Sequence, residues 1–288
     1  MINLVNRWLL KWVFITLALS FIIIFHSSDL VAAQIPVTAS STEIFNRLKP
    51  VLTKEMNANG LKFGSPVYFR VFKREHIFEV WIEKNGIYQL LKTFRICRLS
   101  GKLVPKFKEG DYQVPEGFYQ VYPHQMQPNS NYHLAFNVGY PNAFDRSKNR
   151  TGSYIMVHGS CASVGCVAMT NEYIEEIYSL AWTAFNNGQK FFRIDIFPFR
   201  MTNSKIQQFL KYFDKKEGFF WDLVKKTLNF MDHHKNPGKN AMTQLASYEE
   251  MIKFWKLLKK ASDLFEEDWI PPEVKVVKGE YVVERAKR

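Results

Sequence analysis

The residues of this chain that are best suited to covalent chemistry are a histidine and a cysteine that lie close together in the sequence, His158 and Cys166. An imidazole can take the proton of a thiol, and the resulting thiolate can attack an electrophilic carbon. Beside them, Gly159 and Gly165 let the backbone bend and free amide N–H groups to face an oxyanion. We therefore predict a nucleophile at Cys166 and a general base at His158. Candidate oxyanion or substrate-binding residues are Gly159, Ser163 and Gly165.

The sequence around this pair predicts the elements that position it. An apolar run at residues 154–157 is typical of a strand and delivers His158 at its end. A second short apolar run, residues 167–169, follows Cys166. Thr170 is a residue type preferred at the start of a helix. We expect a strand that ends at His158 and a helix that begins after Thr170.

Alternation of apolar and polar residues predicts further strands on both sides of the site. These strands are expected at residues 67–71, 78–82, 87–96, 133–137 and 191–197. Asn85 and Gly86, between the second and the third, favour a tight hairpin turn. Three strands then precede any catalytic residue.

The flanks of this β-rich segment show helical patterns. Residues 41–56 carry Ile44, Leu48 and Leu52 at helical spacing, which predicts a short helix before a linker. Beyond residue 199 a helix is expected at 221–228, and another begins at Ser247. A last strand or tail is expected at the C-terminus, at 274–283. The predicted division is 1–33 for a leader, 34–66 for helix and linker, 67–199 for a catalytic domain, and 200–288 for a helical C-terminal region.

The segment from His158 to Cys166 resembles the signature of the L,D-transpeptidase catalytic domain family, also called the YkuD-like family. That signature is His-Gly, a spacer and then Ser-His-Gly-Cys, which correspond here to residues 158–159 and 163–166. A short spacer and Val164 in place of the second histidine are closest to the YafK-like branch. Two further landmarks of the family are similar to residues 100–102 and 114–119.

This resemblance implies a mainly β catalytic domain, a sandwich or barrel with a helix after the nucleophile, beside a helical C-terminal region. It implies an exported L,D-transpeptidase-family acyltransferase that acts on peptidoglycan stem peptides through a Cys166 thioester, in cell wall biogenesis and cell shape. No cofactor and no metal are implied. The alternative is a hydrolase of the same fold that detaches a lysine-anchored outer-membrane lipoprotein from diaminopimelate of peptidoglycan. Ala168 stands where most members have a substrate-holding arginine, so transfer and hydrolysis both stay open.

Two other interpretations of these residues belong to different classes of protein. His158, Cys161 and Cys166 would supply three of the four ligands of a zinc site, although their spacing is not a common zinc pattern. A wall-binding module without activity would keep the family frame, but the presence of both His158 and Cys166 argues against it. We keep the thiol enzyme as the prediction.

Charge and the N-terminus indicate an exported protein with an anionic partner. The formal net charge is +12, which favours nucleic acid, acidic lipid or a carboxylate-bearing wall polymer. Arg7 and Lys11 precede an apolar run at residues 12–25 and then small residues, so a signal peptide that ends at Ala33 is predicted. The alternative is an uncleaved inner-membrane anchor. Both place the rest of the chain in the periplasm, which excludes nucleic acid and leaves peptidoglycan as the expected partner.

The chain has three cysteines, Cys97, Cys161 and Cys166. An odd number in an exported protein leaves at least one thiol unpaired. If Cys166 is the nucleophile, Cys97 and Cys161 either form a disulfide or both stay reduced.

Three lysines, Lys102, Lys106 and Lys108, fall on a long loop expected between the two further landmarks. Charged side chains on loops usually face solvent. We expect these lysines to form a solvated face and not to contact substrate.

Overall fold

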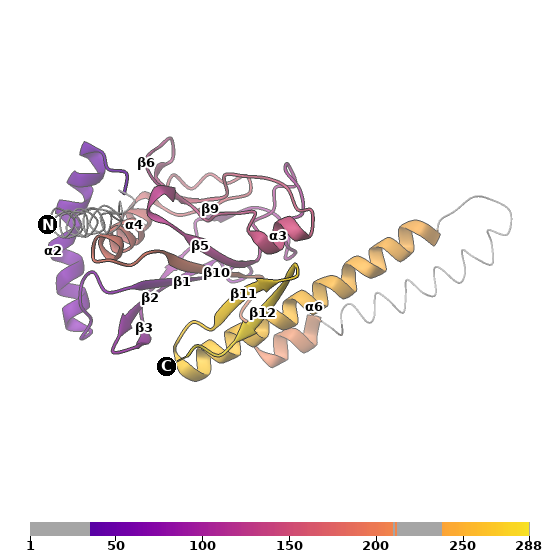
Figure 1. The fold of residues 1–288 in the computed structure, drawn as a ribbon. Helices are drawn as coiled ribbons and strands as arrows, with labels where there is room; N and C mark the ends of the chain where they lie inside the picture. Colours follow the sequence, from indigo (N-terminus) through magenta and orange to yellow (C-terminus); the bar gives the residue numbers. More distant parts are fainter. Residues whose placement is uncertain (1–34, 210, 212–237, 288) are drawn as a thin grey trace, which may run out of the picture. The chain divides into compact units, whose positions relative to one another are not determined.

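The computed structural model of the protein describes residues 35–209, 211 and 238–287 (Figure 1). The predicted leader and the helix expected at 221–228 lie outside these residues, so both stay predictions. From Ile35 onward the chain forms one unit by its contacts. None of the described helices is both long and apolar enough to span a membrane.

Two five-stranded β-sheets lie at the centre of this unit (Figure 1). In spatial order, the first sheet consists of β3 (Ile87–Arg95), β2 (Ile77–Lys84), β1 (Val67–Phe72), β10 (Phe192–Phe197) and β5 (Gly117–Val121). The second sheet consists of β4 (Arg98–Leu99), β9 (Val167–Ala168), β8 (Met156–His158), β7 (His133–Asn137) and β6 (Met126–Ser130). The pairs β1–β10 and β8–β9 run parallel, and the other neighbours run antiparallel. The predicted mainly β catalytic region is confirmed.

The main hydrophobic core joins both sheets to a helix, α4 (Asn171–Asn186). Phe69 of β1 and Phe136 of β7 stack across this core with ring centroids 6.2 Å apart. Thr170 caps the helix, because its hydroxyl oxygen accepts a hydrogen bond from the Tyr173 amide at 3.3 Å. The helix predicted after Cys166 is therefore confirmed.

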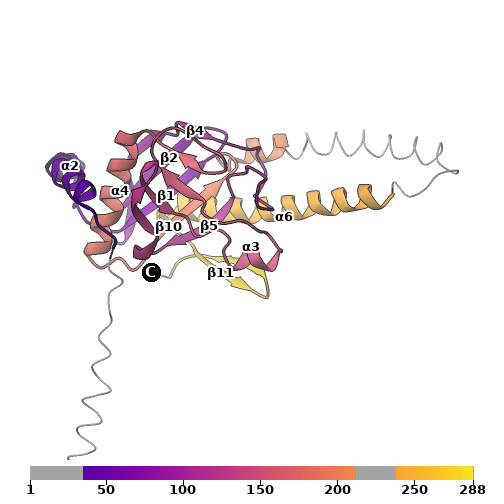
Figure 2. The same ribbon diagram turned by 90° about the horizontal axis from the view of Figure 1, so that it is seen from above.

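A second helix, α2 (Ala39–Ala58), lies beside α4 (Figure 2). The rings of Phe45 and Trp182 are 4.3 Å apart, and Arg47 forms an ion pair with Glu175. Two short elements, η1 (Pro123–Gln125) and α3 (Ala143–Ser147), lie in the connections between strands.

The C-terminal region covers the other face of the first sheet (Figures 1 and 2). It consists of α6 (Gly238–Asp268) and a hairpin of β11 (Glu273–Val277) and β12 (Glu280–Glu284). Tyr68 packs on Phe265 of α6 with ring centroids 5.0 Å apart, and Arg70 hydrogen-bonds Glu266 at 3.1 Å. Strand β1 is consequently buried at every position, not only at alternate ones.

Two details of this region differ from the prediction. Ser247 lies inside α6, which already begins at Gly238, so the start predicted at Ser247 is wrong. Alanine, leucine, methionine and glutamine precede Ser247, and all four favour helix. A capping pattern does not start a new helix where the residues before it are already helical. The last strand is one half of a hairpin, because Lys278 and Gly279 adopt positive φ and turn the chain back.

A buried ion pair ties α6 to the loop that follows β4. The Lys73 ammonium donates to Glu116 Oε1 at 2.9 Å and to the carbonyls of Val104 and Val114. The indole N–H of Trp255, on α6, donates to Glu116 Oε2 at 2.8 Å. Burial lowers the pKa of Lys73, and the Glu116 carboxylate opposes that change. Glu116, which lies in the family-like segment 114–119, therefore joins α6 to this loop.

Replacing Lys73 by methionine should destabilise the fold strongly, because it leaves the Glu116 carboxylate buried without its cation. We expect the free energy of unfolding in urea to fall by about 3–5 kcal/mol. The matched control is Lys275→Met, which removes the exposed pair with Glu273 and should change little. Equal losses in both variants would contradict this account.

Candidate active site

The structure places His158 and Cys166 on adjacent segments of the second sheet. Strands β8 and β9 pair in parallel, with Val157 opposite Val167 and His158 opposite Ala168. Cys166 precedes β9 by one residue and is therefore next to Met156. Because residues two apart on a strand project to the same face, continuing this register by one residue would bring the imidazole and the thiol to one side of the sheet. Diagonal positions of this kind are about 7–8 Å apart between Cα atoms, within reach of two side chains.

The Cys166 thiol is only partly buried and has polar neighbours on one edge. The Met156 amide donates to Sγ at 3.4 Å, and the thiol lies 3.7 Å from the Tyr154 carbonyl. Burial raises the pKa of Cys166, while the Met156 N–H and the Lys106 ammonium act in the opposite direction. The resting sulfur is therefore a thiol that needs a base.

His158 is a buried, oriented imidazole. Its Nδ1 lies 2.6 Å from the Gly159 carbonyl, which can only accept, so Nδ1 carries the proton and Nε2 is free to take one. Burial lowers the pKa of His158, and the bond to Gly159 opposes that change. Tyr132 covers the ring, with centroids 4.8 Å apart. The sequence offered no sign of Tyr132, since tyrosine on a turn is common.

The backbone between the two residues is held by side chains. The Ser163 hydroxyl donates to the Cys166 carbonyl at 2.6 Å, and Ser100 accepts from the Gly165 amide. The Gly159 amide donates to the Tyr132 and Leu134 carbonyls. These two glycine amides already have acceptors, whereas the Cys166 amide has none among the described residues. The predicted roles of Gly159, Ser163 and Gly165 stay predictions.

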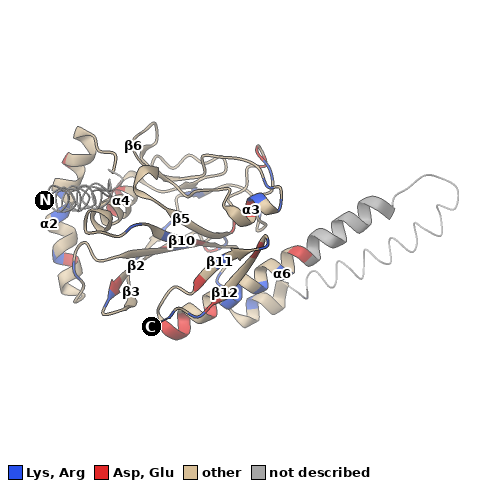
Figure 3. Ribbon diagram, in the orientation of Figure 1, with Lys and Arg blue, Asp and Glu red and all other residues tan. Residues whose placement is uncertain are grey.

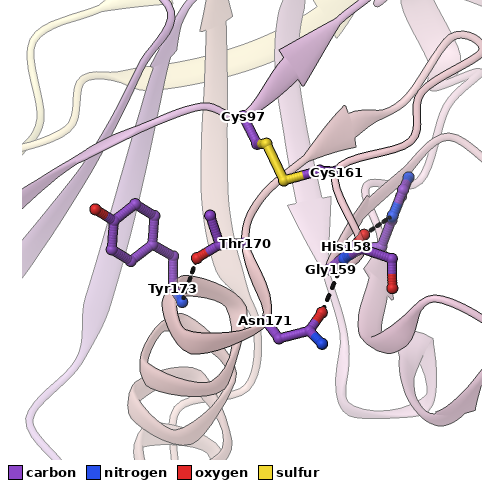
Figure 4. Close-up of a disulfide and its surroundings, with 8 residues drawn as sticks. Cys97, His158, Gly159, Cys161, Thr170, Asn171 and Tyr173 are labelled. Carbon is purple, nitrogen blue, oxygen red and sulfur yellow. Dashed lines mark hydrogen bonds between the residues drawn. A yellow bond between two sulfur atoms is a disulfide. The ribbon is translucent and has the colours of Figure 1, made fainter.

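A disulfide joins the other two cysteines, Cys97 and Cys161, whose Cα atoms lie 5.3 Å apart (Figure 4). The Cys97 amide donates to the Ala168 carbonyl at 2.9 Å, so the bridge fastens the loop after His158 beside β9. At the same loop, the Ser160 amide donates to the Asn171 side chain on α4. The sequence left open whether Cys97 and Cys161 are bonded, and the structure shows that they are. The zinc interpretation fails because the Cys161 sulfur is in this disulfide and is not available as a ligand.

Lys106 departs from the expected solvated face. Lys and Arg residues are spread over α2, α3, α6 and several strands (Figure 3), but Lys106 is buried while Lys102 and Lys108 are exposed. Its ammonium donates to Asp111 Oδ1 at 2.6 Å and to the Lys108 carbonyl at 3.0 Å. A carboxylate five residues along the same loop turns this lysine inward.

The family model for the L,D-transpeptidase catalytic domain, YkuD, matches residues 66–183. YafK of Escherichia coli (strain K12), provisionally named an L,D-transpeptidase, is 38% identical over 222 residues, 77% of this chain and 75% of YafK. The same figures hold for YafK of Escherichia coli O157:H7.

The similarity of this chain to solved structures is weaker than its similarity to YafK. The helical cell shape determining protein Pgp2 of Campylobacter jejuni is 24% identical, with a TM-score of 0.37 over 50% of this chain and 54% of Pgp2. Bd1075 of Bdellovibrio bacteriovorus is 23% identical, with a TM-score of 0.32 over 47% of this chain and 49% of Bd1075. The chain thus spans about half the length of each.

The disulfide should contribute measurably to stability, because it closes a loop of 64 residues in the unfolded chain. Replacing Cys97 and Cys161 together by alanine should lower the free energy of unfolding by about 2–4 kcal/mol. The control is Cys166→Ala, which removes the free thiol and leaves the bridge intact. A double variant as stable as the control would show that the bridge does not constrain the fold.

Alkylation of Cys166 by iodoacetamide should keep accelerating above pH 8.5, because burial raises the thiol pKa beyond its usual value of about 8.5. The lowered pKa of His158 keeps the imidazole neutral near pH 7, so no imidazolium is present to stabilise a thiolate. The rate at each pH is followed by intact mass. A plateau in the rate between about pH 5 and 7 would reveal a preformed thiolate–imidazolium pair and contradict the prediction.

Proposed function

This chain belongs to the YkuD family of L,D-transpeptidase catalytic domains, and from that premise we propose that it transfers acyl groups of peptidoglycan stem peptides through a thioester on Cys166. The family makes it a peptidoglycan-related enzyme. The observation that supports the finer proposal is a partly exposed thiol that accepts from the Met156 amide, two residues before a buried imidazole whose Nδ1 is bound to the Gly159 carbonyl. This arrangement suits a proton transfer that accompanies attack.

The proposed reaction has two halves. In the first, His158 Nε2 takes the Cys166 proton as Sγ attacks the carbonyl of the third stem residue, a diaminopimelate. The Cys166 amide donates to the developing oxyanion, and His158 returns the proton to the departing amine. In the second half, another amine attacks the thioester and forms a cross-link, which frees the thiol.

Hydrolysis of the same thioester is the second candidate function. Ala168 lies opposite His158 in the β8–β9 register and is fully buried, so the position where the family usually has an arginine offers no cation. That loss is compatible with a changed acyl donor. The donor we propose for this case is a lysine-anchored outer-membrane lipoprotein joined to diaminopimelate, with water as the acceptor.

We place the protein in the periplasm. The Cys97–Cys161 disulfide supports this location, because such bridges persist in oxidising compartments such as the bacterial periplasm. The N-terminal pattern of Arg7, Lys11 and an apolar run supports export as well. Both the signal peptide and the uncleaved anchor agree with this location.

Replacing Cys166 by alanine should abolish all turnover and leave the fold intact, since the side chain is small and partly exposed. Replacing His158 by glutamine should lower kcat about 10²–10⁴-fold, because a positioned base is lost. Purified protein is incubated with disaccharide-tetrapeptides and, separately, with lipoprotein-linked muropeptides, and products are identified by mass.

The products distinguish the two candidate functions. Cross-linked dimers from tetrapeptides support transfer, whereas release of the lipoprotein with a free diaminopimelate carboxylate supports hydrolysis. If neither substrate reacts while Cys166 is readily alkylated, both candidates are wrong. Turnover that survives in Cys166→Ala would exclude the thioester.

A further inference from the structure

The loop between β4 and β5 holds a charged side chain that the reaction described above does not use. Lys106 is 4% exposed, although lysine is among the residues least often buried. A buried ammonium is costly unless it is paired and hydrogen-bonded. The buried Lys106 ammonium therefore needs a compensating contact. The same ammonium acts to lower the pKa of Cys166.

The compensating contacts come from one short turn. Asp111 accepts from the Lys106 ammonium and from the amides of Phe107, Lys108 and Gln113. Burial acts to raise the pKa of Asp111, but these hydrogen bonds outweigh it and lower the pKa. The Lys106 ammonium also lies 5.9 Å from the centroid of the Tyr140 ring. The cation is thus held in one position by a charged partner and an aromatic face.

The segments that enclose Lys106 also touch the nucleophile. A Cβ added to Gly152 would lie 2.8 Å from Lys106 Cε, so the glycine, which also has a φ of +125°, leaves room for the lysine stem. Two residues further along, the Tyr154 carbonyl faces the Cys166 thiol. The Gln113 carbonyl oxygen would lie 3.8 Å from a Cβ added to Gly165, the residue before Cys166. Lys106 therefore packs against the segment that, two residues later, contacts the thiol.

We propose that Lys106 is a positioning residue whose ammonium charge, held by Asp111, stabilises the Cys166 thiolate. This role rests on the proposed function, because a stabilised thiolate matters only if Cys166 acts as a nucleophile. Neither of two residues near the sulfur supplies a charge, because the neutral His158 carries none and Ala168 carries none. The Lys106 charge opposes the effect of burial on the thiol and is already in place before substrate binds.

The test measures the pH dependence of Cys166 alkylation by iodoacetamide, which needs no substrate. Cys166 is the one free thiol of the described residues, and the sequence holds three cysteines in all, so intact mass reports a single site. In Lys106→Met the midpoint of the rate profile should rise by about one pH unit, because an opposite charge near the thiolate is lost. In Lys106→Arg, which keeps the charge, it should stay close to wild type.

A second variant moves the midpoint the other way and does not depend on the folding of the first. Asp111→Asn removes the charge that neutralises Lys106 but keeps an acceptor for the loop amides, so the midpoint should fall. The matched control is Lys108→Met, an exposed lysine on the same loop, which should leave the midpoint unchanged. Circular dichroism and thermal melting confirm that each variant is folded.

The proposal is overturned if folded Lys106→Met titrates like wild type, or if Lys108→Met shifts the midpoint as far. If Lys106→Met does not fold, the proposal is overturned when the alkylation midpoint of Asp111→Asn equals or exceeds that of wild type. Failure of the proposed function gives a different result: no turnover of any peptidoglycan substrate, with the alkylation midpoints still shifted. If the wild-type protein turns over substrate but Lys106→Met shows no shifted midpoint, the proposed function is retained and the proposed role of Lys106 is rejected.

Discussion

The parallel pairing of β8 with β9 is the constraint on which this site depends. Val157 and Val167 are opposite each other and fully buried in the main core, so apolar packing sets the register of two very short strands. A slip by one residue would turn His158 or Cys166 to the other face of the sheet. The relative position of His158 and Cys166, the proposed base and nucleophile, is therefore determined by core packing, and the loop between them only has to close the connection. The disulfide and the Asn171 contact hold that loop against β9 and α4.

Burial has opposite effects on the pKa values of His158 and Cys166. It raises the pKa of Cys166 and lowers the pKa of His158, so the neutral pair is favoured over the ion pair. In the proposed reaction the proton would then have to move as the new bond forms, which is the situation in which an oriented Nε2 is useful. The Gly159 carbonyl supplies the orientation, and the Met156 amide supports the charge that appears on sulfur. Each contact is local to the strands that carry the two residues.

The elements near the site could be predicted from the sequence because their patterns are local. The strand before His158 and the helix capped by Thr170 depend on residues within a few positions, and both are found. The burial of Lys106 could not be predicted, because its partner Asp111 matters only once the loop has closed on itself. Similarly, the polar side of β1, with Arg70, resembles a solvent face until α6 covers it. Side chains stabilised by distant parts of the chain leave no periodic pattern in the sequence.

Long-range contacts of this kind connect the C-terminal helix to the loop that carries Lys106. Trp255 of α6 and Lys73 both bind Glu116, and Lys73 also binds the carbonyls of Val104 and Val114. Those carbonyls bracket the stretch that contains Lys106 and its turn. Because the pair is buried, its geometry tolerates little displacement, and the loop is held at both ends from the side of the sheet opposite the main core. The helix α6 thus supports the surroundings of Cys166 through the loop ends, although no contact between α6 and the sulfur is required.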